Sequence, residues 1–439
     1  MPSTAEGFDR VLSALRREHV ERASTALDYE VVKLFRNPIS PGNCFHDFLL
    51  RQAAAQGAER LAFLTQARQT LDADSYRLRF QGTWRAMTSD GCPPDARTPV
   101  WRRYLASRGI EARDPQKVMG FIEKTASAYD AQYRDEQDNL ARQADPNRLG
   151  FRGGSGLFVT SIFDTAFRLD RLVAHIRRAR AEPFQRVLVA GPGLNIVDQF
   201  LGTQVPVSSP QPVCLLESLL SHRLAHERTR VDLVDLSPEV MAHWTLASRG
   251  VADYPILAYL LAGAPHGEAG RLTRAYLENF GRRLPSSEAE WFVNREPRRG
   301  VLWADPSGRF LPAPAGLHVR EFIARAAVLK RFAPSLGDIV TDRIAAEGTY
   351  DLAVATNLLL YFEPREAALA VFNLGRLLNP GGYLFVTEDL DPVLPSGHPL
   401  QRVWIDEMKD AAPPGVTLPA LYVYRKQASA RAQPDSAAR

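Results

Sequence analysis

Apolar side chains recur at helical spacings along the first third of the chain. Such spacings occur at Leu12, Leu15 and Val20, at Leu49, Leu50 and Ala53, and at Val118, Phe121 and Ile122. Prolines divide this part into short segments, and the polar segment 126–149 is expected to form a solvated helix that ends before Pro146. The pattern predicts a helical N-terminal region over residues 1–150.

Beyond residue 150 the pattern changes to short runs rich in Val and Leu and bounded by Gly, Asp, Asn or Pro. Such runs are typical of buried parallel strands. The six runs are 186–190, 231–235, 317–322, 350–356, 382–387 and 420–425. Because helical stretches such as 364–378 lie between several of them, we predict a doubly wound, Rossmann-like α/β sheet.

Two intervals between the predicted strands, 203–229 and 245–316, are too long for simple crossovers. We expect both to be insertions. The second precedes the third predicted strand and is expected to be helical, with helices at 256–261 and 272–280.

The expected domain organisation follows from these patterns. A helical region at 1–150 precedes a sheet domain at 151–426, and the polar segment 427–439 is expected to be a disordered tail.

Composition narrows the protein class without pointing to a chemistry. The 439 residues are 45% hydrophobic and carry 54 basic against 50 acidic side chains, which excludes wholesale disorder. The basic residues are scattered among the acidic ones, which disfavours a nucleic-acid binder. Three widely spaced cysteines suit neither a disulfide framework nor a thiolate zinc site. With no membrane-spanning run and no secretory signal at the N-terminus, we expect a cytoplasmic protein.

A glycine turn follows the first predicted strand. In Gly191-Pro192-Gly193 two glycines one residue apart allow a tight turn and a close approach of the backbone to a ligand. The next helix would present free N–H groups there. The alternative is an ordinary turn between a strand and a helix.

The second predicted strand ends in Asp235, followed by Leu236, Ser237 and Pro238. A carboxylate at this place commonly accepts hydrogen bonds from both hydroxyls of a ribose. Alternatively, Asp235 or Ser237 is a helix N-cap with Pro238 at the first helical position. The two interpretations are compatible.

The segments 350–362 (YDLAVATNLLLYF) and 377–386 (LLNPGGYLFV) resemble the fourth strand and the loop into the fifth strand of class I S-adenosylmethionine-dependent methyltransferases. Within that superfamily, TNLLLYF…LLNPGGYLFVTEDL and the closing LYVYRK at 421–426 are most similar to the chemotaxis-receptor methyltransferase type. The resemblance covers about residues 160–245 and 317–426, and it does not extend to 1–150.

The resemblance implies a binding site for S-adenosylmethionine. Gly191 and Gly193 would face the methionine part of the cofactor, and Asp235 with Leu236 would bind the ribose. The pair Asp338–Ile339 matches the position at which an acid commonly contacts the adenine amino group.

Two positions depart from the family's pattern. Val189 stands where an acid is usual, and Asn195 takes the place of the third glycine. Asn tolerates left-handed backbone geometry better than most residues, so Asn195 could still serve.

The methyl-transfer residues are also implied by the resemblance. Asn357, at the end of the fourth strand, would line the transfer site, and Tyr361 would pack beside cofactor or substrate. Glu388 and Asp389 follow the fifth strand and are candidates for a base, which a hydroxyl or amine acceptor would need. The alternative for both acids is a solvated loop.

Competing chemistries fit the sequence less well. Ile196 stands where a nicotinamide-binding fingerprint needs its last glycine, and the pair His222 and His226 lacks the Glu of a zinc protease. We therefore predict a methyltransferase that uses S-adenosylmethionine and acts on an unidentified small-molecule or protein acceptor. A small molecule is favoured over a protein, and a nucleic acid is disfavoured. The alternative is a non-catalytic protein that binds S-adenosylmethionine or S-adenosylhomocysteine.

Overall fold

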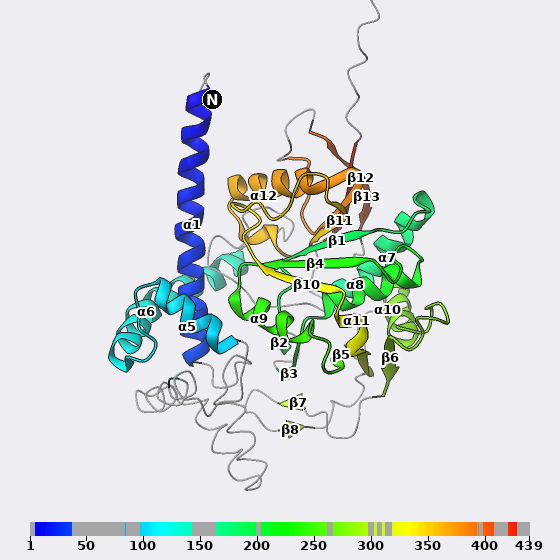
Figure 1. Cartoon of the computed structure of the whole chain (residues 1–439), viewed down its shortest axis with the longest axis horizontal. Coiled ribbons are helices and arrows are strands. Elements are labelled where there is room, and N and C mark those ends of the chain that lie inside the picture. Colours follow the sequence, from blue (N-terminus) through cyan, green and yellow to red (C-terminus); the bar gives the residue numbers. More distant parts are fainter. Residues whose placement is uncertain are drawn as a thin grey trace, which may run out of the picture.

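A seven-stranded sheet forms the centre of the computed structural model (Figure 1). The structure describes residues 5–36, 84, 97–142, 164–198, 203–260, 267–296, 303–304, 310–311, 318–392, 394, 398–407 and 420–427. The predicted helical positions 49–53, the last part of the predicted polar helix at 143–149, and the predicted tail 427–439 apart from its first residue lie outside these residues. Within the described part, no helix has the length and apolar composition of a membrane span.

The strand order confirms the predicted doubly wound sheet. Across the sheet the strands are β10 (Phe332–Leu336), β4 (Arg230–Asp235), β1 (Arg186–Ala190), β11 (Tyr350–Ala355), β12 (Leu378–Val386), β14 (Leu421–Lys426) and β13 (Leu400–Asp406). The neighbours from β10 to β12 pair in parallel, and β14 runs antiparallel to both of its neighbours.

Alternation along the central strands separates two cores. In β1, Val187 and Val189 face one cluster, whereas Leu188 and Ala190 face the other. The first cluster includes α7 (Asp164–Ala179), α8 (Pro210–Ser221) and α9 (Pro238–Ala247), and the second includes α12 (Pro364–Leu377). Strands buried on both faces are mostly apolar, which is why these runs stood out in the sequence.

The long insertion is not all helical, in contrast to the prediction. It includes α10 (Gly267–Asn279) and a three-stranded antiparallel sheet of β5 (Tyr254–Leu260), β9 (His318–Ala324) and β6 (Phe292–Arg295). The predicted helix at 272–280 is confirmed. The predicted helix at 256–261 is wrong, because β5 pairs along its whole length with β9.

The third strand of the central sheet was also misplaced. The run at 317–322 belongs to β9, and the third strand is β10, which follows the short helix α11 (Ala326–Leu329). Its sequence, FAPSL, contains Pro334 and Ser335 and has no apolar run. As an edge strand, β10 tolerates a proline and leaves Leu336 exposed. Only its pairing with β4 in the folded structure identifies it as a strand.

A β-ribbon stands between the glycine turn and the next helix. The chain enters β2 (Asn195–Asp198), which pairs with β3 (Thr203–Ser208), and the small strands β7 (Trp303–Ala304) and β8 (Phe310–Leu311) extend this sheet. The helix α8 begins only at Pro210. The ribbon therefore separates the glycine turn from the next helix along the chain, which the sequence analysis did not predict.

The N-terminal region is helical in its described parts, with α1 (Ala5–Arg36), α5 (Arg97–Ser107) and α6 (Pro115–Arg142). These helices share a small core of Val31, Trp101, Leu105, Val118 and Ile122. Figure 1 shows α1 upright beside one end of α12, with α5 and α6 along its lower half. The region thus lies against the sheet domain, and α5 packs on α9.

Candidate active site

The predicted site residues converge on one edge of the sheet. Because β1, β4, β10, β11 and β12 are parallel, their carboxyl ends lie at the same edge. The glycine turn, Asp235, Asp338, Asn357 and Glu388 each follow or end one of these strands. In open α/β sheets this edge is where ligands bind.

The glycine turn forms a backbone cradle. Gly191 and Gly193 have φ values of 63° and 58°, in the left-handed region that favours glycine. A Cβ atom on Gly191 would lie 2.9 Å from Cδ1 of Leu358, so a side chain would also collide there. Ser209, the N-cap residue of α8, donates from Oγ to the Pro192 carbonyl at 3.1 Å. The inserted ribbon therefore still leaves the α8 N-terminus beside the turn.

Asp235 ties the turn to the end of β4. Its Oδ1 accepts the Ser237 N–H at 2.8 Å, and its Oδ2 accepts the Gly193 N–H at 3.4 Å. Ser237, one of the two N-cap candidates in the sequence, is the N-cap of α9 and accepts the Val240 N–H. Asp235 is 8% exposed and the next residue, Leu236, is half-buried. The carboxylate lies at the turn, in the position proposed for a ribose ligand.

Asn195 does not take the backbone geometry expected for it. It is the first residue of β2 and pairs with Ser208. The non-glycine residues with positive φ in the described part of the chain are Arg223 and Asn357. The argument that Asn195 replaces a glycine in a left-handed turn is therefore wrong.

Asn357 is the residue that does adopt left-handed geometry at this edge, with φ of 54°. Its N–H donates to Oγ1 of Thr387 at 2.7 Å, and that hydroxyl donates to Oε1 of Glu388 at 2.7 Å. A hydrogen-bonded chain thus joins the end of β11 to the end of β12. It fixes one oxygen of the Glu388 carboxyl group.

Two substitutions test whether the left-handed backbone of Asn357 contributes to stability. We expect Asn357→Ala to lower the free energy of unfolding by about 1–2 kcal/mol, because alanine resists left-handed φ. Asn357→Gly should cost less than Asn357→Ala, because glycine adopts this φ freely. Urea unfolding of the two variants measures the difference. Equal losses would mean that the amide, not the backbone, carries the stability.

Glu388 is buried, so the solvated-loop interpretation is wrong for it. Its side chain is 1% exposed, and Oε2 has no hydrogen-bond partner among the described residues. Burial raises the pKa of Glu388 to about 7, although hydrogen bonds from Thr387 and nearby backbone groups oppose the shift. A carboxyl group with this pKa can accept a proton near neutral pH.

The neighbouring acid has a different role. Asp389 accepts a hydrogen bond from the Tyr424 hydroxyl at 3.0 Å and another from Arg402 at 3.0 Å. Both partners lie on the outer antiparallel strands β14 and β13. The side chain of Asp389 is thus bound to the outer strands β13 and β14, whereas that of Glu388 is buried at the end of β12.

Tyr361 ends the short 3-10 helix η1 (Leu359–Tyr361) and is half-buried. Sequence reasoning missed three further polar residues at this edge, Gln211, Thr356 and Thr387. Gln211, in the first turn of α8, donates to the hydroxyl of Thr356, and both side chains are buried. Thr356 and Thr387 each adjoin a predicted residue, whereas nothing in the sequence around Gln211 distinguishes it.

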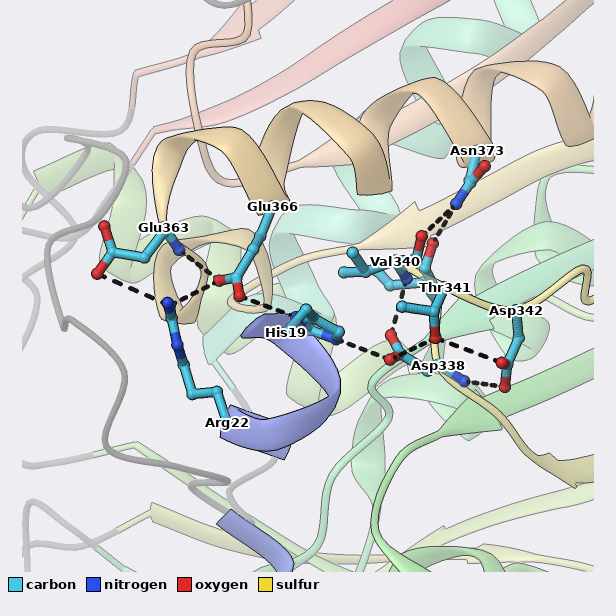
Figure 2. Close-up of polar contacts among 10 residues, drawn as sticks. His19, Arg22, Asp338, Val340, Thr341, Asp342, Glu363, Glu366 and Asn373 are labelled. Atoms are coloured by element: carbon cyan, nitrogen blue, oxygen red, sulfur yellow. Dashed lines mark hydrogen bonds and ion pairs between the residues drawn. The ribbon is translucent and has the colours of Figure 1, made fainter. Parts of the chain in front are cut away.

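At the end of β10, Asp338 is bound by a residue of the N-terminal helix (Figure 2). His19 of α1 lies between two carboxylates, with Nε2 2.7 Å from Oδ2 of Asp338 and Nδ1 3.0 Å from Oε1 of Glu366. Arg22 also contacts Glu366, at 2.8 Å. Ile339, the other residue predicted for the adenine, is 5% exposed. No sequence pattern had marked His19.

The two carboxylates make His19 strongly basic. Burial alone would lower its pKa, but the hydrogen bonds and charges of Asp338 and Glu366 outweigh burial and raise the pKa to about 9. For both carboxylates burial alone would raise the pKa, and the hydrogen bond from His19 is the largest of the contacts that lower it. The three groups thus form a charged, buried cluster at neutral pH.

This cluster predicts how the docking of α1 depends on pH. The contribution of His19 is complete below its ordinary pKa of 6.5 and is lost as pH rises through about 9, a total of about 3 kcal/mol. The contributions of Asp338 and Glu366 are present above pH 3.8 and 4.5 and are lost as pH falls further. Amide exchange in α1, corrected for intrinsic rates, should be slowest between about pH 4.5 and 6.5. A protection that stays constant up to pH 10 would contradict this expectation.

Solved methyltransferases resemble this chain at low identity and low TM-score. No family model matches the sequence, and no curated protein does. The chain is similar to the N-methyltransferase NodS from Bradyrhizobium japonicum WM9, with 11% identity, a TM-score of 0.28, and coverage of 61% of this chain and 100% of that one. It is also similar to a Burkholderia thailandensis 1,6-didemethyltoxoflavin-N1-methyltransferase, with 14% identity, a TM-score of 0.28, and coverage of 69% and 87%.

At such identities and TM-scores these matches carry no argument about the activity of the chain. The strand order of the central sheet is observed in the structure itself and does not depend on these matches. Counted along the chain, the seven strands of the central sheet lie in the order 3-2-1-4-5-7-6 with the seventh antiparallel. This is a doubly wound, Rossmann-like arrangement, and the segments at 350–362 and 377–386 that resemble class I methyltransferases lie on and after two of its central strands.

Proposed function

We propose that the protein is an S-adenosylmethionine-dependent methyltransferase. The observation that carries the proposal is the meeting of three features at the carboxyl edge of a sheet with this strand order. They are the left-handed glycine cradle, the buried carboxylate of Asp235, and the hydrogen-bonded chain from Asn357 to Glu388.

The residues at this edge fit such a cofactor. Gly191 and Gly193 present left-handed backbone without side chains where a methionine group would lie, and Asp235 would hold the ribose hydroxyls beside Leu236. Asp338 would receive the adenine amino group, and the Ile339 backbone would flank the ring. The bound cofactor supplies an electrophilic methyl group on a sulfonium, so the protein's task is largely to position the acceptor and exclude water.

The acceptor is proposed to be a small molecule with an amine or hydroxyl group. Glu388 would take the proton that this nucleophile loses as its bond to the methyl carbon forms, and Tyr361 would pack against it. A carboxylate acceptor needs no base and would be repelled by the ionised Glu388. This argues against the receptor-carboxylate chemistry of the chemotaxis type, for which the resemblance at 356–390 and 421–426 is the remaining support. A cytoplasmic location and domain boundaries near 150 and 426 stay predictions from the sequence.

A second candidate function is binding of S-adenosylmethionine or S-adenosylhomocysteine without turnover. Val189 in place of an acid and the β2–β3 ribbon after the glycine turn favour it. Both candidates share the same cofactor site and differ in whether a methyl group is transferred.

Calorimetric titration of S-adenosylhomocysteine and S-adenosylmethionine into the full chain tests the shared part of the proposal. We expect micromolar or tighter binding of both. Radiolabelled S-adenosylmethionine, offered with a panel of amines and phenols, then separates the two candidates. Transfer of label to one class supports the enzyme, whereas binding with no transfer supports the binding protein. Absence of binding by either ligand would exclude both.

A further inference from the structure

The N-terminal helix places an imidazole at the proposed adenine subsite. His19 is 3% exposed and lies between the loop that follows β10 and the first turn of α12. Its ring meets Phe362 edge-on, with the ring centroids 5.9 Å apart. Figure 2 shows His19 on a turn of α1, directed at Asp338 on one side and at Glu366 on the other.

The acceptor capacity of Asp338 is almost fully used in this arrangement. Oδ2 accepts hydrogen bonds from His19 at 2.7 Å and from the Thr341 hydroxyl at 2.8 Å, and Oδ1 accepts the Val340 N–H at 2.8 Å. A carboxylate offers about four acceptor sites. An incoming amino group would therefore compete most directly with His19, because Val340 and Thr341 belong to the same loop as Asp338.

We propose that His19 is a latch on the adenine subsite: its imidazole holds the Asp338 oxygen that the adenine amino group needs, so that cofactor binding requires α1 to release His19. The inference rests on the proposed function, since it is that function which assigns Asp338 to the adenine. Beyond the proposed function, it makes α1 a competitor of the cofactor for Asp338.

Several charged groups stabilise the docked His19, and the carboxylates keep other hydrogen bonds when it is released. His19 faces the carboxylates of Asp338 and Glu366, and its own helix adds Arg22, which pairs with Glu366 and lies 3.8 Å from Glu363. Asp342 faces the same loop and accepts the Asp338 N–H. On release, Glu366 keeps the hydrogen bond from the Glu363 N–H, and Asp338 keeps those of its own loop. Neither carboxylate would be left without partners.

Release also changes the protonation of His19. Docked, its pKa is about 9, whereas an imidazole in water returns to about 6.5. Near pH 8 the docked ring carries a proton that the released ring loses. Cofactor binding should then liberate about one proton, and the wild-type affinity should rise with pH between about 6.5 and 9.

The test compares S-adenosylhomocysteine binding to the full-length wild type, His19→Ala and the control Val20→Ala. Val20 is the next residue on α1 and is half exposed. Titration near pH 8 in two buffers of different ionisation enthalpy gives both affinity and proton release. We expect His19→Ala to bind about tenfold tighter or more, because no fraction of the protein is held latched. We also expect it to release about one proton fewer than the wild type.

The outcomes separate this inference from the function on which it rests. Equal or weaker binding by His19→Ala, with the same proton release as the wild type, would overturn the latch and leave the proposed function standing. Absence of binding by the wild type and by both variants would overturn the proposed function itself. The proton count of the wild type needs no variant, so a His19→Ala protein that fails to fold would still leave the latch testable.

Discussion

Asp235→Ala is expected to weaken the binding of S-adenosylhomocysteine by a hundredfold or more. The carboxylate would accept hydrogen bonds from both ribose hydroxyls, and a hydrogen bond to a charged group contributes about 1.5–3 kcal/mol. The same change removes the acceptor of the Gly193 and Ser237 N–H groups, which loosens the cradle as well. Calorimetric titration measures the affinity directly, and no methyl acceptor is needed.

Asp232→Ala is the matched control for this experiment. Asp232 lies three residues earlier on β4, is buried to the same extent, and pairs with Arg186 and with the Tyr350 hydroxyl. Its loss should lower stability without changing the affinity, because it lies away from the carboxyl edge. If the two variants bind S-adenosylhomocysteine equally well, Asp235 has no part in the site.

Glu388→Gln is expected to lower the rate of methyl transfer by about 100-fold or more once an acceptor is identified. A positioned base contributes roughly 10²–10⁴ to the rate, and glutamine keeps the shape and the bond with Thr387 but cannot take a proton. The affinity for S-adenosylhomocysteine should stay within about threefold of the wild type. Initial rates under saturating cofactor, together with calorimetry, separate the two effects.

The role of Glu388 as a base also predicts how the rate of methyl transfer depends on pH. Since only ionised Glu388 can act as a base, the wild-type rate should rise with pH through about 7, the pKa to which burial raises this group. Asp389→Asn is the matched control, because Asp389 is the adjacent acid and is occupied by Tyr424 and Arg402. A profile that stays flat across neutral pH in the wild type, or an equal loss in both variants, would remove Glu388 from the mechanism.

Much of the sheet could be predicted from local pattern. The runs at 186–190, 231–235, 350–356, 382–387 and 420–425 all lie on or within one residue of central strands. A strand buried on both faces is mostly apolar, and that composition is visible in one short segment. Strand β10 gave no such signal, because an edge strand is buried less.

The wrong prediction of a helix at 256–261 also has its cause in strand pairing. A short apolar run has no period of its own, so a helix and a strand cannot be told apart until a partner is known. The partner is β9, more than fifty residues later along the chain. The prediction failed because pairing, and not propensity, decides such a segment.

The sequence by itself determined the α/β sheet, the glycine turn and the acid at the end of β4, because each depends on residues close together along the chain. Only the tertiary structure decided that Glu388 is buried while Asp389 pairs with the outer strands, and that His19 lies between Asp338 and Glu366. Those two carboxylates are 319 and 347 positions from His19 along the chain. Burial and charge depend on neighbours brought together by folding, and no local pattern records them.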